Sequence, residues 1–236
     1  MTKGKRSSRS ASTRSRSLAQ SASRADRPLI TTVIFDLDDT LYDCLGQRVH
    51  AAHFRAAEAM AAAGCSYVDL GAESFDQKVL DAVGKNMRAE ATEHAVRILK
   101  RHGIAVELNI LLGATPVDSE ASIARTLTEL ERLDVDYALF SIANPFPGTD
   151  FYQAAKANGW LAYGDYIPVD PAKNAIISYP HLSQRRLEEL ARRAYRRHYL
   201  RPKALYRELR KIRSPADLRD KLVAGLRLVR RTLDTP

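Results

Sequence analysis

The amino-acid sequence predicts an α/β fold built on a parallel sheet. Apolar, β-branched runs of strand length alternate with amphipathic helical stretches, which is the pattern of βα units. The chain has 236 residues and is 45% hydrophobic, so it can bury a sizeable core. A complete (β/α)₈ barrel needs about 250 residues. We therefore expect a partial (β/α) barrel or an open parallel sheet of about four to five strands, followed by C-terminal helices.

The order of elements follows from periodicity and from stop signals. Strands are predicted over residues 29–36, 67–70, 104–112 and 137–143. Helices are predicted over residues 44–63, 76–84, 89–102 and 119–133, with a short helix capped by Thr149 or Asp150. Ser119 and Ser122 stand where a weaker variant of the capping box would place its two side chains. Residues 160–182 are expected to be irregular, and everything from Ser183 onward is expected to be helical, with breaks at Pro202 and Pro215.

The net charge of +9 comes from the two ends of the chain. Residues 1–27 carry +7 and residues 184–236 carry +11, whereas residues 28–183 carry −9. Basic ends are suited to contact with an anionic membrane surface. Nucleic-acid binding is not expected, because the C-terminal region has few interleaved aromatic residues and no reading motif.

Four segments are expected along the chain. They are a disordered basic Ser/Arg-rich tail (1–28), a first βα unit (29–64), the main α/β segment (65–182) and a basic helical tail (183–236). The start of the chain lacks the apolar stretch of a secretory signal, and no apolar run reaches the roughly 18 residues of a membrane span. These features predict a cytoplasmic protein.

Two carboxylates follow the first predicted strand. Asp36 lies at its carboxyl end and Asp38 two residues on, so both side chains can face one pocket. Mg²⁺ relieves the repulsion between such close carboxylates through oxygen ligands. This stretch resembles the haloacid-dehalogenase-like hydrolases, whose first motif is D-x-D-x-[TV]. The resemblance implies Asp36 as nucleophile, Asp38 as acid/base and Mg²⁺ as cofactor. The Lys and the late acidic pair of that family are not found in matching context.

Residues 66–213 resemble a different family. The motifs are YVDLGAES (67–74), DQKVLDAVGK (76–85), LLG (111–113) and FSIANPFPGT (140–149). In this order they resemble the C-terminal half of a radical S-adenosylmethionine barrel. The nearest subgroup is the cobalamin-dependent kind, typified by the anaerobic Mg-protoporphyrin ester cyclase. The resemblance implies that Glu73 and Ser74 contact the ribose or amino-acid part of S-adenosylmethionine, that Gly113 lets the backbone approach the adenine, and that Asn144 lies near the adenine edge.

The chain departs from this family in its cysteines. The family binds a [4Fe–4S] cluster with a C-x₃-C-x₂-C loop, and this chain has only Cys44 and Cys65. No iron–sulfur cluster is therefore expected from this chain alone, and the cobalamin-binding domain is also missing.

The leading interpretation is a hybrid chain: a hydrolase-like βα unit joined to half of a radical S-adenosylmethionine enzyme, acting as a remnant or accessory part. Its expected partners are a small-molecule cofactor or substrate and a partner chain that completes the barrel. One alternative is a Mg²⁺-dependent phosphatase that uses Asp36. A second alternative is a non-catalytic interaction protein that uses its basic C-terminal helices, including peripheral membrane contact. Whether the chain is an enzyme is left open.

Overall fold

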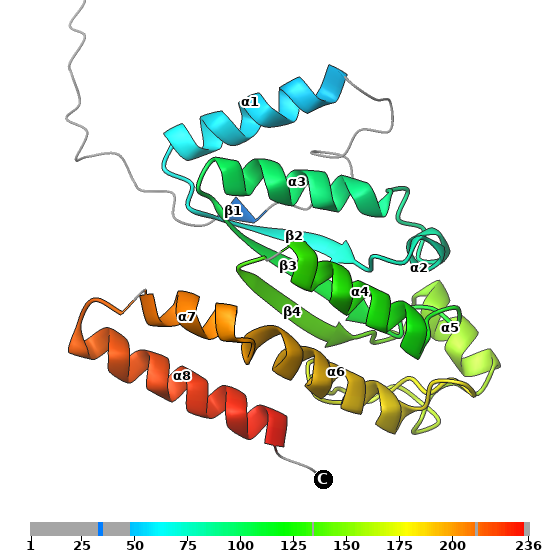
Figure 1. The fold of residues 1–236 in the computed structure, drawn as a ribbon. Coiled ribbons are helices and arrows are strands. Elements are labelled where there is room, and N and C mark those ends of the chain that lie inside the picture. Colours follow the sequence, from blue (N-terminus) through cyan, green and yellow to red (C-terminus); the bar gives the residue numbers. More distant parts are fainter. Residues whose placement is uncertain (1–32, 35–47, 134, 211, 234–236) are drawn as a thin grey trace, which may run out of the picture.

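The strands and helices alternate along the chain as the sequence predicts (Figure 1). A computed structural model describes residues 33–34, 48–133, 135–210 and 212–233. The strands are β1 (Val33–Ile34), β2 (Tyr67–Glu73), β3 (Ala105–Leu112) and β4 (Tyr137–Ile142). The helices are α1 (Arg48–Ala62), α2 (Gln77–Ala82), α3 (Ala89–Arg101), α4 (Glu120–Leu133), α5 (Asp150–Ala157), α6 (Gln184–Tyr199), α7 (Pro202–Arg210) and α8 (Pro215–Leu233).

The described strands form one parallel sheet in the order β1-β2-β3-β4. Val68 pairs with Val106 and Leu108 pairs with Ala138, so neighbouring strands run in register and in the same direction. Because each crossover passes through a helix, the carboxyl ends of β2, β3 and β4 meet at one edge of the sheet. The predicted α/β class and parallel sheet are thus confirmed.

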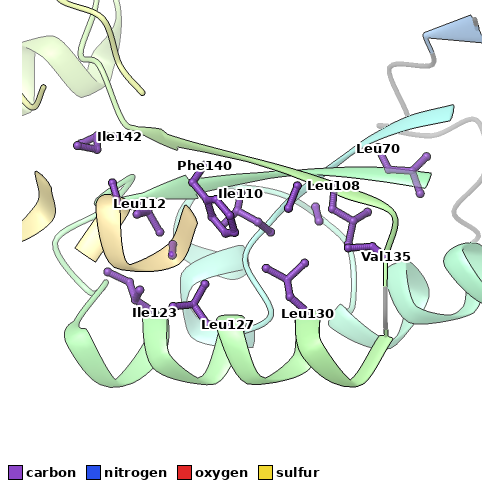
Figure 2. Packing of buried hydrophobic residues seen from close by; sticks show 14 of the residues in the cluster. Leu70, Leu108, Ile110, Leu112, Ile123, Leu127, Leu130, Val135, Phe140 and Ile142 are labelled. Carbon is purple, nitrogen blue, oxygen red and sulfur yellow. The ribbon is translucent and has the colours of Figure 1, made fainter. Parts of the chain in front are cut away.

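One face of the sheet is buried beneath helices. Side chains alternate along each strand, so every second residue of β2, β3 and β4 points into this layer. Leu108, Ile110 and Phe140 meet Ile123 and Leu127 of α4 there (Figure 2). Helices α3 and α6 extend the same layer toward β3 and β4. The apolar runs of the sequence are therefore explained by burial on this face.

The edge strand β4 is covered by two tyrosines of α6. The Tyr199 hydroxyl accepts from the Ala138 N–H at 3.1 Å and donates to the Ala138 carbonyl at 2.9 Å. The Tyr195 hydroxyl makes the same pair of contacts with Phe140, at 3.3 and 3.2 Å. Residues four apart on a helix share a face, so the two hydroxyls occupy the positions that a further strand would fill. This edge of the sheet is closed to strand addition.

Several predicted helix starts are confirmed at the level of their caps. The Ser122 N–H donates to Ser119 Oγ at 3.2 Å, while the Ser119 N–H donates to Ser122 Oγ at 2.8 Å, which is the reciprocal pattern of a capping box. Thr149 and Ser183 cap α5 and α6. Pro202 and Pro215 break the C-terminal region as predicted, because each is the first residue of a new helix.

Strand β2 is longer than the sequence indicates. The prediction ended it at Leu70, because Gly71 resembles the start of a turn, but pairing with β3 continues to Glu73 through an irregularity between Gly71 and Glu73. Residues 160–182 are irregular as expected, with two isolated bridges, Leu161–Ile177 and Tyr179–Leu182. Most of the predicted first strand and the predicted disordered tail (1–28) lie outside the described residues.

Candidate cofactor-binding site

The four residues that the sequence predicts as cofactor contacts lie at one edge of the sheet. Glu73 ends β2 and Ser74 follows it, Gly113 follows β3, and Asn144 lies two residues after β4. In a parallel α/β sheet, ligands bind in the crevice beyond the carboxyl ends of the strands. The fold brings the predicted residues to that edge, and their individual surroundings differ.

Glu73 combines backbone strain with an ion pair. Its φ angle is 57°, the only positive value among the described non-glycine residues. An L-residue in this left-handed region costs roughly 1–2 kcal/mol, and such strain is concentrated at functional sites. The carboxylate Oε1 lies 3.2 Å from Lys85 Nζ, and both atoms lie beside the Cα of Gly71, where a larger residue would crowd them. The Glu73 carboxylate at the end of β2 is therefore positioned by Lys85 and remains partly exposed.

Ser74 is used within the fold. Its side chain is buried, its hydroxyl lies 3.1 Å from Thr126 Oγ1 of α4, and it accepts from the Asp76 N–H at 3.1 Å. Asp76 in turn caps α2 and accepts from Arg125 Nε at 2.9 Å. Burial acts to raise the pKa of Asp76, but the Arg125 guanidinium and backbone N–H groups outweigh it and lower the pKa. These contacts connect the end of β2 to α4 and fix the loop that carries Glu73.

Gly113 is required by a tight turn. Its φ angle is 69°, and a Cβ there would lie 3.0 Å from the side chain of Leu187. The Gly113 N–H donates to Asp118 Oδ2 at 2.8 Å, and the Gly113 carbonyl accepts from the Tyr179 hydroxyl at 3.0 Å. Packing against Leu187 and these hydrogen bonds therefore explain why a glycine is needed at this position, and the sequence alone did not indicate this explanation. Its role toward an adenine stays a prediction.

The side chain of Asn144 has an unsatisfied hydrogen-bond acceptor. Its Oδ1 is buried and accepts no hydrogen bond from the residues that the structure describes. A buried acceptor without a partner costs roughly 1–3 kcal/mol relative to a satisfied one. At the carboxyl end of β4, this oxygen is suited to accept from an N–H or O–H group of a ligand.

A row of polar side chains, which the sequence analysis missed, lies on the face of the sheet opposite the helices. Asp69 Oδ1 accepts from Asn109 Nδ2 at 2.9 Å across β2 and β3. The Tyr67 hydroxyl donates to Glu107, and its ring centroid lies 6.0 Å from that of Tyr137 on β4. The sequence signal that could have predicted this row is the presence of polar residues at every second position of otherwise apolar strands. This row gives the sheet a polar face leading to the Glu73 end.

Glu107 makes the stability of this face depend on pH. Burial raises the pKa of the Glu107 carboxyl, and nearby Asp69 adds to the rise, while the hydrogen bond from Tyr67 opposes it. The folded chain then holds a proton that the unfolded chain releases earlier, so stability falls as pH rises from the usual glutamate pKa to the raised value.

Replacing Glu107 with Gln is expected to remove this fall. Relative to the wild type, Glu107→Gln gains melting temperature at pH 7 and gains less at pH 4, as read by circular dichroism. Glu58→Gln, at an exposed position of α1, is the matched control and is expected to show no pH-dependent difference. An equal offset for Glu107→Gln at both pH values would show that the carboxyl has no raised pKa.

The hydrolase-type residues are not tested by the structure. Asp36, Asp38 and Cys44 lie outside the described residues, so the predicted Mg²⁺ site stays a prediction. Cys65 is buried at the amino end of β2, away from Glu73, and its thiol lies 3.4 Å from the Tyr67 carbonyl. Among the described residues, no group of three His, Cys, Asp or Glu side chains is placed to hold a metal ion.

Comparison with known proteins finds relatives among methyltransferases and an ester cyclase. No family model matches the chain. An uncharacterized methyltransferase of Pyrococcus horikoshii is 31% identical over 165 residues, which is 69% of this chain and 35% of the relative. The bacteriochlorophyllide d C-12(1)-methyltransferase of Chlorobaculum tepidum is 30% identical over 115 residues, covering 47% and 25%. The anaerobic magnesium-protoporphyrin IX monomethyl ester cyclase of Rubrivivax gelatinosus is 32% identical over 95 residues, covering 39% and 16%.

These matches support the second resemblance that the sequence analysis found. The ester cyclase is the type of protein that was named there for residues 66–213. The chain spans about a third of the length of the Pyrococcus relative and less of the other two. The chain is thus similar in sequence to part of several methyltransferases and of an anaerobic ester cyclase.

Proposed function

We propose that this chain provides the S-adenosylmethionine-binding part of a radical S-adenosylmethionine system of the cobalamin-dependent kind. Support comes from its similarity to methyltransferases and to an ester cyclase, and from the residues gathered at the carboxyl edge of its sheet. In this proposal the chain binds and orients the cofactor and does not supply the iron–sulfur cluster.

The observation that carries the proposal is the pairing of strain at Glu73 with the unmet acceptor at Asn144. Both lie at the ends of parallel strands, where such folds place their ligands. A strained acid and an unsatisfied amide oxygen each cost stability in the absence of a ligand. A bound molecule that donates hydrogen bonds at this edge would offset both costs.

The residues at this edge fit S-adenosylmethionine. The Glu73 carboxylate, held by Lys85, can accept from ribose hydroxyls or from the amino group of the methionine part. The side-chain oxygen Oδ1 of Asn144 can accept a hydrogen bond from the adenine amino group. When bound, S-adenosylmethionine supplies an activated methyl group or, beside a reduced cluster, a radical precursor. The chain's own part is to hold the two ends of the cofactor at fixed positions.

The cluster does not fit this chain. A [4Fe–4S] cluster takes several thiolates that can converge on it, and the 236 residues contain two cysteines. The one described cysteine, Cys65, is buried at the amino end of β2, the end opposite Glu73. We infer that the cluster ligands come from polypeptide outside these residues. Because Tyr195 and Tyr199 cover the β4 edge, that polypeptide would extend the sheet on the β1 side.

Calorimetry of S-adenosylmethionine binding tests the proposal. The full chain is expected to bind one equivalent, and Asn144→Ala is expected to bind roughly fivefold more weakly because one hydrogen bond is lost. Glu73→Gln is expected to weaken binding by a similar or larger factor, because a charged acceptor is replaced. Asn158→Ala, at the exposed C-terminal end of α5, is the control and should bind like the wild type. No binding by a folded wild-type chain would refute the proposal.

A further inference from the structure

The last two helices form an antiparallel hairpin that lies against α6. Helix α7 ends at Arg210 and α8 begins at Pro215, and α8 turns back beneath α7 and continues toward α6 (Figure 1). An ion pair between Glu208 of α7 and Lys221 of α8 joins them. The hairpin is attached to the rest of the molecule through the buried Ala204 of α7, through Arg207, which donates to the Asp136 carbonyl at 2.7 Å, and through contacts of α8 with α6.

The leucines of both helices lie on the same side of this hairpin. Relative to Glu208, Leu205 and Leu209 stand three residues before and one after. Relative to Lys221, Leu218 and Leu222 stand at the same two offsets. Each residue advances a helix by roughly 100°, so both pairs lie at the same angle from the contact between the helices. Two antiparallel helices are related by a two-fold axis perpendicular to their plane, and this axis puts both pairs on one face.

This face is exposed and apolar. Leu209 is 63% exposed and Leu222 is 59% exposed, although such side chains are usually buried. We call all the exposed large apolar residues of α7 and α8, on this face and beside it, the hairpin patch; they are Leu205, Tyr206, Leu209, Leu218, Leu222, Val223 and Leu226. Exposed large apolar side chains gathered on two neighbouring helices mark an interaction surface.

The sequence of the hairpin is rich in basic residues. Residues 202–233 contain ten Lys or Arg and three acids. Arg210 lies over the ring of Tyr206, with 5.9 Å from its guanidinium carbon to the ring centroid, and Arg219 is exposed. Apolar side chains on one face with Lys and Arg beside them are typical of helices that lie in the plane of a membrane interface.

We propose that the hairpin patch docks on the surface of an anionic lipid bilayer. The leucines enter the boundary between headgroups and acyl chains, and the surrounding Lys and Arg contact the anionic headgroups. RNA fits this surface less well. Its phosphates would pair with the Lys and Arg side chains, but it offers no apolar surface against which the exposed leucines could be buried. Among the described residues no helix is long and apolar enough to cross a bilayer. In this proposal the hairpin lies in the plane of the membrane interface, and the docking does not depend on what binds at the carboxyl edge of the sheet.

Vesicle sedimentation with the full chain tests this docking. Vesicles of phosphatidylcholine with 30% phosphatidylglycerol, used as an anionic probe at roughly 0.1 M salt, are expected to bind the wild type at least about tenfold more tightly than phosphatidylcholine alone. The double variant Leu209→Glu/Leu222→Glu is expected to lose at least about tenfold in partitioning to the anionic vesicles. Val117→Glu/Ile167→Glu, also exposed, adds the same charge elsewhere and should still bind.

Three results would overturn the proposal. One is absence of wild-type binding to anionic vesicles. Another is equal loss in both double variants, which would show that net charge alone matters. The third is a concentration-dependent dimer in analytical ultracentrifugation that only Leu209→Glu/Leu222→Glu abolishes, without vesicle binding, which would assign the hairpin patch to a second copy of the chain. Circular dichroism melts confirm that each variant is folded.

Discussion

Replacing Phe140 with Ala is expected to destabilise the fold by about 3–5 kcal/mol, the usual cost of removing a buried phenyl ring. Phe140 is fully buried on β4, between the sheet and the helices (Figure 2). Its ring packs edge-on against Tyr195, with centroids 5.1 Å apart, and near His198. The cavity would loosen α6 from the edge strand that its tyrosines cover. Urea unfolding followed by circular dichroism measures the loss.

The neighbouring residue provides the control for Phe140→Ala. Leu139 points to the opposite face and is 39% exposed, so Leu139→Ala is expected to change stability by less than about 1 kcal/mol. Similar effects of Phe140→Ala and Leu139→Ala would contradict the assignment of the buried face.

Replacing Asp118 with Ala is expected to cost about 3 kcal/mol, because it leaves the buried Gly113 N–H without an acceptor and removes an acceptor of the buried Ser122 hydroxyl. Asp118 is 2% exposed, and its carboxylate accepts from the Gly113 N–H at 2.8 Å and the Ser119 N–H at 2.9 Å. The Ser122 hydroxyl also donates to it. Burial nevertheless raises the pKa of Asp118. This side chain thus holds the turn after β3 to the start of α4.

The isosteric variant separates these hydrogen bonds from packing. Asp118→Asn keeps the size but turns an amino group toward one N–H donor, so we expect a loss of roughly 1–3 kcal/mol, smaller than for Ala. Asp81→Ala, at an exposed position of α2, should leave stability nearly unchanged. The role given to Asp118 fails if Asp118→Ala melts within experimental error of the wild type.

Local sequence signals predicted the elements of this fold well. Strands β3 and β4 and helices α3 and α4 begin and end within a few residues of their predicted bounds, because apolar periodicity and glycine stops are encoded in neighbouring residues. The reciprocal bonds of Ser119 and Ser122 were also readable, since a cap depends on a spacing of three residues.

Features that depend on distant residues could not be predicted in this way. The hydroxyls of Tyr195 and Tyr199 replace a strand partner for β4 from 55 and 61 residues away. The extension of β2 to Glu73 depends on its pairing with β3. Local sequence patterns do not indicate this pairing, because Glu73 has a positive φ angle that is unusual for a strand residue. Gly113 was predicted to let the backbone approach a ligand. In the structure, a Cβ at this position would contact Leu187, which lies 74 positions later in the sequence.

Hydrogen–deuterium exchange of the full chain with and without S-adenosylmethionine tests whether the cofactor binds at the carboxyl edge of the sheet. We expect slower exchange on cofactor binding in the segments at the ends of β2, β3 and β4, namely residues 73–76, 113–118 and 143–148, with no change in α8. Protection confined to other parts of the chain, or none at saturating cofactor, would contradict a binding site at the carboxyl edge of the sheet.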